Sequence, residues 1–170
     1  MSAPSVGIIM GSKSDLNVMK ESAQVLEELG IGFELTILSA HRTPHRVMDF
    51  AEKARGRGIK VIIAGAGMAA HLPGVIAAFT TLPVIGVPVI AANSPAGMDS
   101  ALAILQMPPG IPVATVALNG ARNAGILAAE ILAAADSTIS DRLEKFRETM
   151  RKKAEELADE IGKKGYQSIL

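Results

Sequence analysis

A doubly wound α/β fold with three layers is predicted by two features of the sequence. Short apolar segments alternate with helical patterns along the chain, and these segments show no alternation of polar and apolar residues. Strands that are covered on both faces are apolar throughout, and the helices between them indicate parallel crossover connections. We therefore expect a flavodoxin-like domain. Its 170 residues suit a single domain, with an α/β core over 5–135 and a long helix over 138–162.

The apolar segments place the strands, and amphipathic or alanine-rich stretches place the helices. In the helix expected over 15–29, Leu16, Met19 and Leu26 recur on one face, and Gly30 ends it. Thr43 is expected to cap the second helix, with Pro44 at its first position, where a missing N–H costs nothing. The strands are expected over 6–10, 33–38, 61–64, 84–87 and 113–116, and the helices over 15–29, 44–56, 69–80, 98–106 and 122–135.

The last part of the chain predicts a long amphipathic helix. Residues 141–164 carry 15 of the 34 charges, while apolar residues recur every three or four positions. Such a helix can pack on its own domain or on a neighbouring subunit. Its length and the lack of a later strand favour partial docking on a neighbour. The recurring apolar residues are Ile139, Leu143, Phe146, Met150, Ala154, Leu157 and Ile161.

Composition excludes several classes of function. The 17 basic and 17 acidic residues balance, which argues against nucleic acid or an anionic membrane as the main partner. The chain has no cysteine, so disulfides, thiolate metal sites and cysteine nucleophiles are excluded. Residues 61–98 contain no Asp, Glu, Lys or Arg, which could indicate a membrane span. Glycine and proline divide this stretch into pieces too short to cross a bilayer as a helix, so we expect that it is buried in an oligomer instead. No secretory leader is recognisable, and we expect a cytoplasmic protein.

The turn after the first expected strand is a candidate phosphate site. It reads Gly11-Ser12-Lys13-Ser14-Asp15. Free N–H groups at a helix start favour an anion, Ser12 can donate to a phosphate, and Asp15 can accept from sugar hydroxyls. The alternative is a simple capped turn with Ser14 as the N-cap. The spacing fits neither a dinucleotide site nor a P-loop.

The turn after the second expected strand carries the strongest chemical signal, Ser39-Ala40-His41-Arg42-Thr43-Pro44. At the carboxyl edge of an open sheet, Arg42 can fix an anion while the imidazole of His41 moves a proton near neutral pH. The alternative is a polar cap with a merely hydrogen-bonded imidazole. A metal pair of His41 and His45 is disfavoured, because Pro44 places His41 before the helix.

A glycine-rich stretch over 64–74 follows the third expected strand. Its small residues expose backbone N–H groups, and His71 is either a ligand contact or a satisfied core histidine. Because the turns after strands one, two and three meet at the same edge of the sheet, we expect one shared anion site. A further stretch over 117–124, with Asn119 and Arg122, belongs either near this site or at a subunit contact.

Taken together, these motifs resemble the class I PurE enzymes of purine biosynthesis. The resemblance covers about residues 5–135 in register. Its motifs are Gly11-Ser12-Lys13-Ser14-Asp15, Ser39-Ala40-His41-Arg42-Thr43-Pro44, Ala64-Gly65-Ala66-Gly67, Ala69-Ala70-His71-Leu72-Pro73-Gly74, Gln106-Met107-Pro108 and Asn123-Ala124.

The resemblance implies conversion of N5-carboxyaminoimidazole ribonucleotide to 4-carboxyaminoimidazole ribonucleotide, without cofactor or metal, in a homo-octamer. An ATP-dependent synthetase of the substrate is the implied pathway partner. By this resemblance His41 is the general acid and base, and Ser12, Asp15 and Arg42 hold the ribose and phosphate. Carbon dioxide would be kept from water by a loop at Ala66 and Gly67, and the remaining pocket residues would be Ser39, His71 and Leu72.

Two departures from the family pattern bear on function. The family usually has a glycine where this chain has Met68, and the stretch 94–100 is one residue longer than its counterpart in the family. That stretch is faintly similar to class II relatives, which carboxylate aminoimidazole ribonucleotide directly with carbon dioxide. Direct carboxylation is therefore an alternative function, and a non-catalytic nucleotide-binding module is another.

Overall fold

The structure, a computed structural model, describes residues 3–94 and 96–169. Within these residues, parallel strands form one sheet in the order β2-β1-β3-β4-β5, which is the flavodoxin-like order. The predicted fold is confirmed. The order reverses between β1 and β3, so this is the point where ligands bind in such sheets. The strands are β1 (Val6–Met10), β2 (Phe33–Ile37), β3 (Val61–Gly67), β4 (Val84–Val89) and β5 (Ala114–Thr115).

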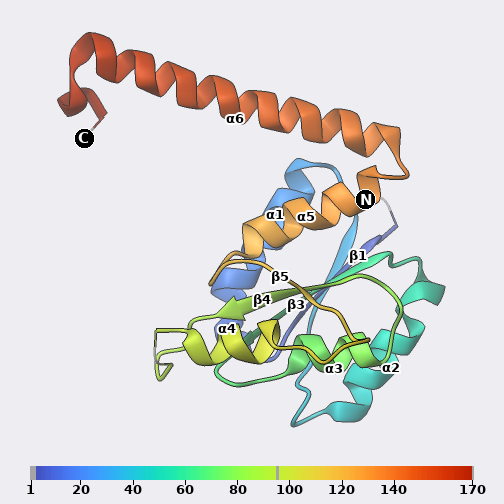
Figure 1. The fold of residues 1–170 in the computed structure, drawn as a ribbon. Coiled ribbons are helices and arrows are strands. Elements are labelled where there is room, and N and C mark those ends of the chain that lie inside the picture. Colours follow the sequence, from blue (N-terminus) through green and yellow to red (C-terminus); the bar gives the residue numbers. More distant parts are fainter. Residues whose placement is uncertain (1–2, 95, 170) are drawn as a thin grey trace.

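Helices cover both faces of the sheet, giving three layers (Figure 1). One face is covered by α1 (Leu16–Glu28) and α5 (Ala121–Ala133), and the other by α2 (Pro44–Ala54), α3 (Leu72–Ala78) and α4 (Met98–Leu105). The long α6 (Ser137–Lys164) follows α5 and extends past the sheet layers. Short 3₁₀ turns are η1 (Lys13–Asp15), η2 (Arg55–Arg57) and η3 (Tyr166–Ile169).

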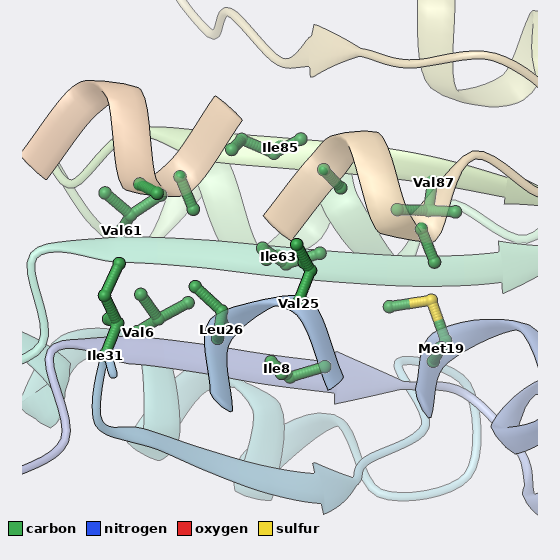
Figure 2. Packing of buried hydrophobic residues seen from close by; sticks show 14 of the residues in the cluster. Val6, Ile8, Met19, Val25, Leu26, Ile31, Val61, Ile63, Ile85 and Val87 are labelled. Carbon is green, nitrogen blue, oxygen red and sulfur yellow. The ribbon is translucent and has the colours of Figure 1, made fainter. Parts of the chain in front are cut away.

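The core follows from the alternation of side chains along the central strands. In β1, Val6, Ile8 and Met10 point to the layer of α1 and α5, while Ile9 points to the other layer. All four side chains are fully buried. Figure 2 shows Val6, Ile8 and their neighbours on β3 and β4 packed beneath α1 and α5. Aliphatic side chains and methionine therefore fill this core, as the composition predicts.

The third strand is longer than predicted, and the third helix is shorter. β3 continues through Gly67 because residues 62–67 pair with β4, so Ala66 and Gly67 are strand residues rather than a loop. α3 begins only at Leu72, with Pro73 in its first turn. β4 runs to Val89 through Pro88, whose missing N–H is tolerated because β5 has already ended at Thr115.

Helix α6 is anchored at its start and exposed beyond it. The Asp136 carboxylate accepts hydrogen bonds from the backbone N–H groups of Thr138 and Ile139, at 3.0 and 3.3 Å. Leu143 is buried against the core, whereas Met150 and Leu157 are about half exposed. The apolar stripe is thus covered only near the start of the helix. None of the described helices combines the length and the apolar character needed to cross a membrane.

Helices α1 and α5 approach so closely that their contact requires Gly125. A Cβ at this position would lie 2.3 Å from Val25 Cγ1 and 3.0 Å from the carbonyl oxygen of Ser22. The Ser22 hydroxyl also donates a 2.6 Å hydrogen bond to the carbonyl oxygen of Ala121, which joins the two helices. The backbone of α1 cannot give way as a flexible side chain would.

Gly125→Val is therefore expected to lower the free energy of unfolding by about 1–3 kcal/mol through overpacking. The measurement is the thermal unfolding midpoint at a fixed protein concentration. Gly162→Val serves as the control, since a Cβ at exposed Gly162 meets nothing within 4 Å. Equal midpoints for the two variants would contradict the close helix contact.

Candidate functional site

A cavity of about 430 Å³ opens at the carboxyl edge of the strands. The segments after β1, β2 and β3 all contribute to it, at the point where the strand order reverses. This confirms the expectation that the three segments meet. The lining residues are Gly11, Ser12, Ser14, Asp15, Ser39, Ala40, His41, Arg42, Ala66, Gly67, Met68, Ala70, Leu72 and Ala91.

The first wall of the cavity is the turn after β1, which is held by its own side chains. Ser12 caps η1: its hydroxyl accepts from Ser14 N at 3.4 Å, and its own N–H donates to Asp15 Oδ2 at 3.0 Å. Ser12, not Ser14, is therefore the N-cap. The Ser14 hydroxyl donates to Asp15 Oδ1 at 3.2 Å. The turn thus holds the Asp15 carboxylate in a fixed place beside the cavity.

Asp15 is a buried carboxyl, only 7% exposed. Burial raises its pKa above the ordinary value, although hydrogen bonds from Ser14 and Ser12 and the nearby charge of Arg42 act in the opposite direction. A buried carboxylate that is unfavourable for the fold but rigidly placed is typical of a binding or catalytic group.

The second wall is the turn after β2, which Arg42 ties to the first. Arg42 Nη2 donates a 2.9 Å hydrogen bond to the carbonyl oxygen of Gly11, and Arg42 Nε donates to the Ser39 hydroxyl at 3.3 Å. The Thr43 hydroxyl accepts from Ser39 N and donates to the Ser39 carbonyl oxygen, both at 3.1 Å. Thr43 lies at the N-cap position of α2, as predicted, and Pro44 lies in the first turn of the helix. The Thr43 side chain makes no capping hydrogen bond, because it closes the preceding turn.

His41 lies on the same turn, is exposed and lines the cavity. Its imidazole therefore shares one cavity with the guanidinium of Arg42 and the carboxylate of Asp15. Among the described residues, no group of three or more His, Asp or Glu side chains is placed to hold a metal ion. His45 lies outside the cavity lining, on another hollow beside α2.

The third wall comes from the end of β3 and the start of α3, and it is apolar. Ala66 and Leu72 are each 2% exposed, so they form a closed surface. Gly67 allows the strand to pass close to its neighbours: a Cβ there would lie 3.4 Å from Ala91 Cβ and 3.9 Å from Asp15 Oδ1. One side of the cavity is thus polar and charged, and the other is apolar.

Not every candidate residue lines this cavity. His71 is exposed at the N-cap of α3 and is not among the lining residues. Arg122 pairs with Glu28 at 2.9 Å and lies over the Phe146 ring, so it joins α5 to α1 and α6. Asn119 accepts a hydrogen bond from Ile90 N at 2.9 Å, which ties the segment after β5 to the end of β4.

Four lining residues were not singled out as ligand contacts by sequence reasoning: Ser14, Ala40, Ala70 and Ala91. Ala91 follows β4, a strand whose carboxyl end was not considered part of the site. Segments that follow parallel strands meet at the carboxyl edge of the sheet, and this rule would have placed Ala91 at the site as well. Within the longer stretch over 94–100, Asp99 Oδ1 accepts from Ser100 N at 2.9 Å and from the Ser94 hydroxyl. Pro95 lies outside the described residues.

A larger hollow of about 800 Å³ lies at the opposite edge of the sheet, around Phe79, Pro83 and Pro112. Its described lining residues include no histidine, and its charged groups are Glu52 and Arg55. Arg55 already donates a 2.9 Å hydrogen bond to the Thr81 hydroxyl. The smaller cavity is therefore the better candidate for a reaction that moves a proton on an anionic ligand.

Comparison with known proteins agrees with this choice of site chemistry. Residues 5–153 match the family described as AIR carboxylase. A relative from Pyrococcus horikoshii, named N5-carboxyaminoimidazole ribonucleotide mutase, is 55% identical over 98% of this chain and 94% of that protein. A mutase of the same name from Thermotoga maritima is 54% identical over 98% and 97%. The crystal structure of Treponema denticola PurE is 29% identical, with a TM-score of 0.78 over 95% of this chain and 98% of that chain.

Proposed function

The chain belongs to the AIR carboxylase family, and we propose that its cavity is the active site of an N5-carboxyaminoimidazole ribonucleotide mutase. The enzyme converts N5-carboxyaminoimidazole ribonucleotide to 4-carboxyaminoimidazole ribonucleotide in purine biosynthesis. The observation that carries the site assignment is the meeting of His41, Arg42 and Asp15 in one cavity with an apolar wall. Relatives that share more than half of its residues over nearly the whole chain support the mutase over direct carboxylation or simple binding.

The reaction moves a carboxyl group from nitrogen to carbon of the same ring system. The carbamate N–C bond breaks, carbon dioxide leaves, and the nitrogen gains a proton. The ring carbon then forms a bond to carbon dioxide and loses its own proton. One general acid and base can serve both steps, and His41 is the imidazole in the cavity that can do so near neutral pH.

The polar walls are suited to the nucleotide. The Ser12 hydroxyl and the Arg42 guanidinium hold the phosphate, since Arg42 has N–H groups beyond the two that bind Gly11 and Ser39. Asp15 accepts from the ribose hydroxyls. Ser39 positions Arg42, and Ala66, Gly67 and Leu72 form the apolar surface for carbon dioxide. His71 takes part in the site only if ligand binding or assembly brings it there.

The experiment that tests the function starts from N5-carboxyaminoimidazole ribonucleotide without ATP or metal. The amount of 4-carboxyaminoimidazole ribonucleotide formed is compared with that from aminoimidazole ribonucleotide plus bicarbonate. Fast conversion of the carbamate and slow use of the second substrate are expected. The reverse preference would indicate a direct carboxylase, and no turnover of either would leave a nucleotide-binding protein.

The reaction bears on the cofactors, the pathway partner and the location of the enzyme. It needs no cofactor or metal, because bond breaking and bond making require only proton transfer and retention of carbon dioxide. Its pathway partner is the ATP-dependent synthetase that supplies the unstable carbamate. We place both in the cytoplasm, with no nucleic acid or membrane partner.

The assembly is a homo-octamer that uses the exposed apolar side chains of α4 and α6. On α4, Leu102 is 47% and Leu105 60% exposed, and on α6, Leu157 is 49% exposed. A monomer rarely leaves such surface in water. The tail over 138–162 would then dock partly on a neighbour.

Leu102→Glu combined with Leu157→Glu is expected to reduce the molar mass in solution, measured by light scattering, because charges would replace apolar contacts. Asn17→Glu, on an exposed position of α1, is the control and should leave the mass unchanged. An unchanged mass for the double variant would exclude these two faces as subunit contacts. A wild-type mass equal to that of one chain would exclude the octamer.

A further inference from the structure

Met68 has a backbone conformation that is unfavourable for its side chain. Its φ is +55°, in the left-handed region, which glycine adopts freely and side chains with a Cβ do not. Asn119 shares this conformation, but asparagine tolerates it, and its side chain binds Ile90 N. Met68 is larger than Ala96, the other described side chain with positive φ. A side chain held in an unfavourable backbone conformation beside a cavity suggests a function for that side chain.

The path of the chain imposes this conformation. Gly67 is still paired with Val89, so β3 remains in the sheet up to the residue before Met68. α3 begins at Leu72, and the chain must turn sharply in the few residues between. Gly67 also packs tightly, since a Cβ there would lie 3.3 Å from the carbonyl oxygen of Val89. The turn therefore occurs at position 68, where glycine would fit most easily.

The side chain at this position contributes to the cavity. Met68 is 54% exposed and lines the same cavity as His41 and Arg42. The other large apolar lining residue, Leu72, is 2% exposed and belongs to the closed wall. Met68 is thus a large apolar lining residue that is about half exposed and does not belong to the closed wall. Methionine is unbranched and flexible, so it can adapt its shape to a ligand.

We infer that Met68 covers the apolar side of the cavity and retains carbon dioxide between the two steps of the reaction. This inference rests on the proposed function, because only a reaction that frees carbon dioxide needs such a cover. Carbon dioxide is small, uncharged and weakly held by polar groups. Its escape competes with attack of the ring carbon on carbon dioxide. An apolar cover that excludes water favours this attack over escape. Met68 is therefore a residue that determines the outcome of the reaction rather than a catalytic group.

The test follows the carboxyl carbon. Substrate carrying ¹³C in the carbamate is converted in buffer with unlabelled bicarbonate, and the labelled fraction of the product is measured together with the aminoimidazole ribonucleotide released. Met68→Gly is expected to raise the ratio of released aminoimidazole ribonucleotide to product by about 3- to 10-fold. This is the effect expected when the barrier to escape of carbon dioxide loses one or two methylene contacts. A reaction without enzyme corrects for spontaneous loss of the carbamate.

Two comparisons make the result decisive. Met68→Leu keeps an apolar side chain and should retain the label like the wild type. The thermal midpoint of Met68→Gly should not fall, because glycine suits the φ of this position, so a change in label cannot be ascribed to unfolding. If the wild type converts the carbamate but Met68→Gly retains the label equally well, the inference is wrong. If the wild type does not convert the carbamate, the proposed function fails instead.

Discussion

The His41→Asn variant is expected to lose about 10²–10⁴-fold in kcat with N5-carboxyaminoimidazole ribonucleotide, the contribution typical of a general acid and base. Asparagine approaches histidine in size and can form hydrogen bonds, but it cannot accept and return a proton near neutral pH. Because His41 is exposed at the cavity surface, the substitution should not disturb the core. Binding of 4-carboxyaminoimidazole ribonucleotide, measured by calorimetry, should be largely kept.

His45→Asn provides the matched control. His45 lies four residues further along, in the first turn of α2, and is exposed and outside the lining of the cavity. Its replacement should leave kcat and KM unchanged. Full turnover in His41→Asn would remove His41 from the mechanism, and loss of nucleotide binding in that variant would change its role from proton transfer to binding.

Asp15→Asn is expected to weaken nucleotide binding by about 10- to 100-fold, because a charged acceptor for the ribose hydroxyls is lost. The same substitution should leave the thermal midpoint at pH 7 unchanged or higher. The buried carboxyl has a raised pKa, so its charged form is unfavourable in the folded protein. An asparagine side chain removes that charge and can still accept the hydrogen bond from Ser12 N.

The stability difference between Asp15→Asn and the wild type should depend on pH. A carboxyl with a raised pKa in the folded state binds its proton more tightly there, so its stabilising contribution is present below the unfolded value of about 3.8. That contribution is lost as the pH rises through the raised pKa. The difference in stability between Asp15→Asn and the wild type should therefore be small near pH 4 and grow toward neutral pH.

Asp49→Asn is the control for charge alone. Asp49 is an exposed carboxylate on α2 that pairs with Lys53, and exposed pairs contribute about 0–1 kcal/mol. Its replacement should change neither nucleotide binding nor the pH dependence of the stability difference. A marked loss of stability in Asp15→Asn at pH 7, with binding intact, would mean that Asp15 serves the fold rather than the ligand.

The strands and helices of the central layers could be predicted because burial leaves a clear pattern in the sequence. β1 is a continuous apolar run that ends at Met10, before Gly11, and its bounds match the prediction. The end of β3 could not be predicted in this way. The predicted strand stops at Ala64 because alanine and glycine are poor strand formers. Gly65 pairs with both β1 and β4, whereas Ala66 and Gly67 stay in the sheet through their pairing with β4.

The candidate site was predictable as far as the topology rule reaches. Segments after parallel strands share one edge, which places Ser12, Arg42 and Gly67 together. The burial of Asp15 depends on packing of η1 against β3 and could not be read from its neighbours in sequence. The position of His71 depends on where α3 begins, and that start was expected earlier in the chain.

The most direct measurement is a crystal structure of the protein with 4-carboxyaminoimidazole ribonucleotide bound. The nucleotide should lie in the cavity between the segments after β1, β2 and β3, with its phosphate at Ser12 and Arg42. The ring carboxyl should lie against Ala66 and Gly67, and the reacting ring should be within about 2.6–3.2 Å of the His41 imidazole, directly or through one water. A nucleotide bound in the hollow around Phe79 and Pro83, or one whose ring points away from His41, would contradict the site and the mechanism together.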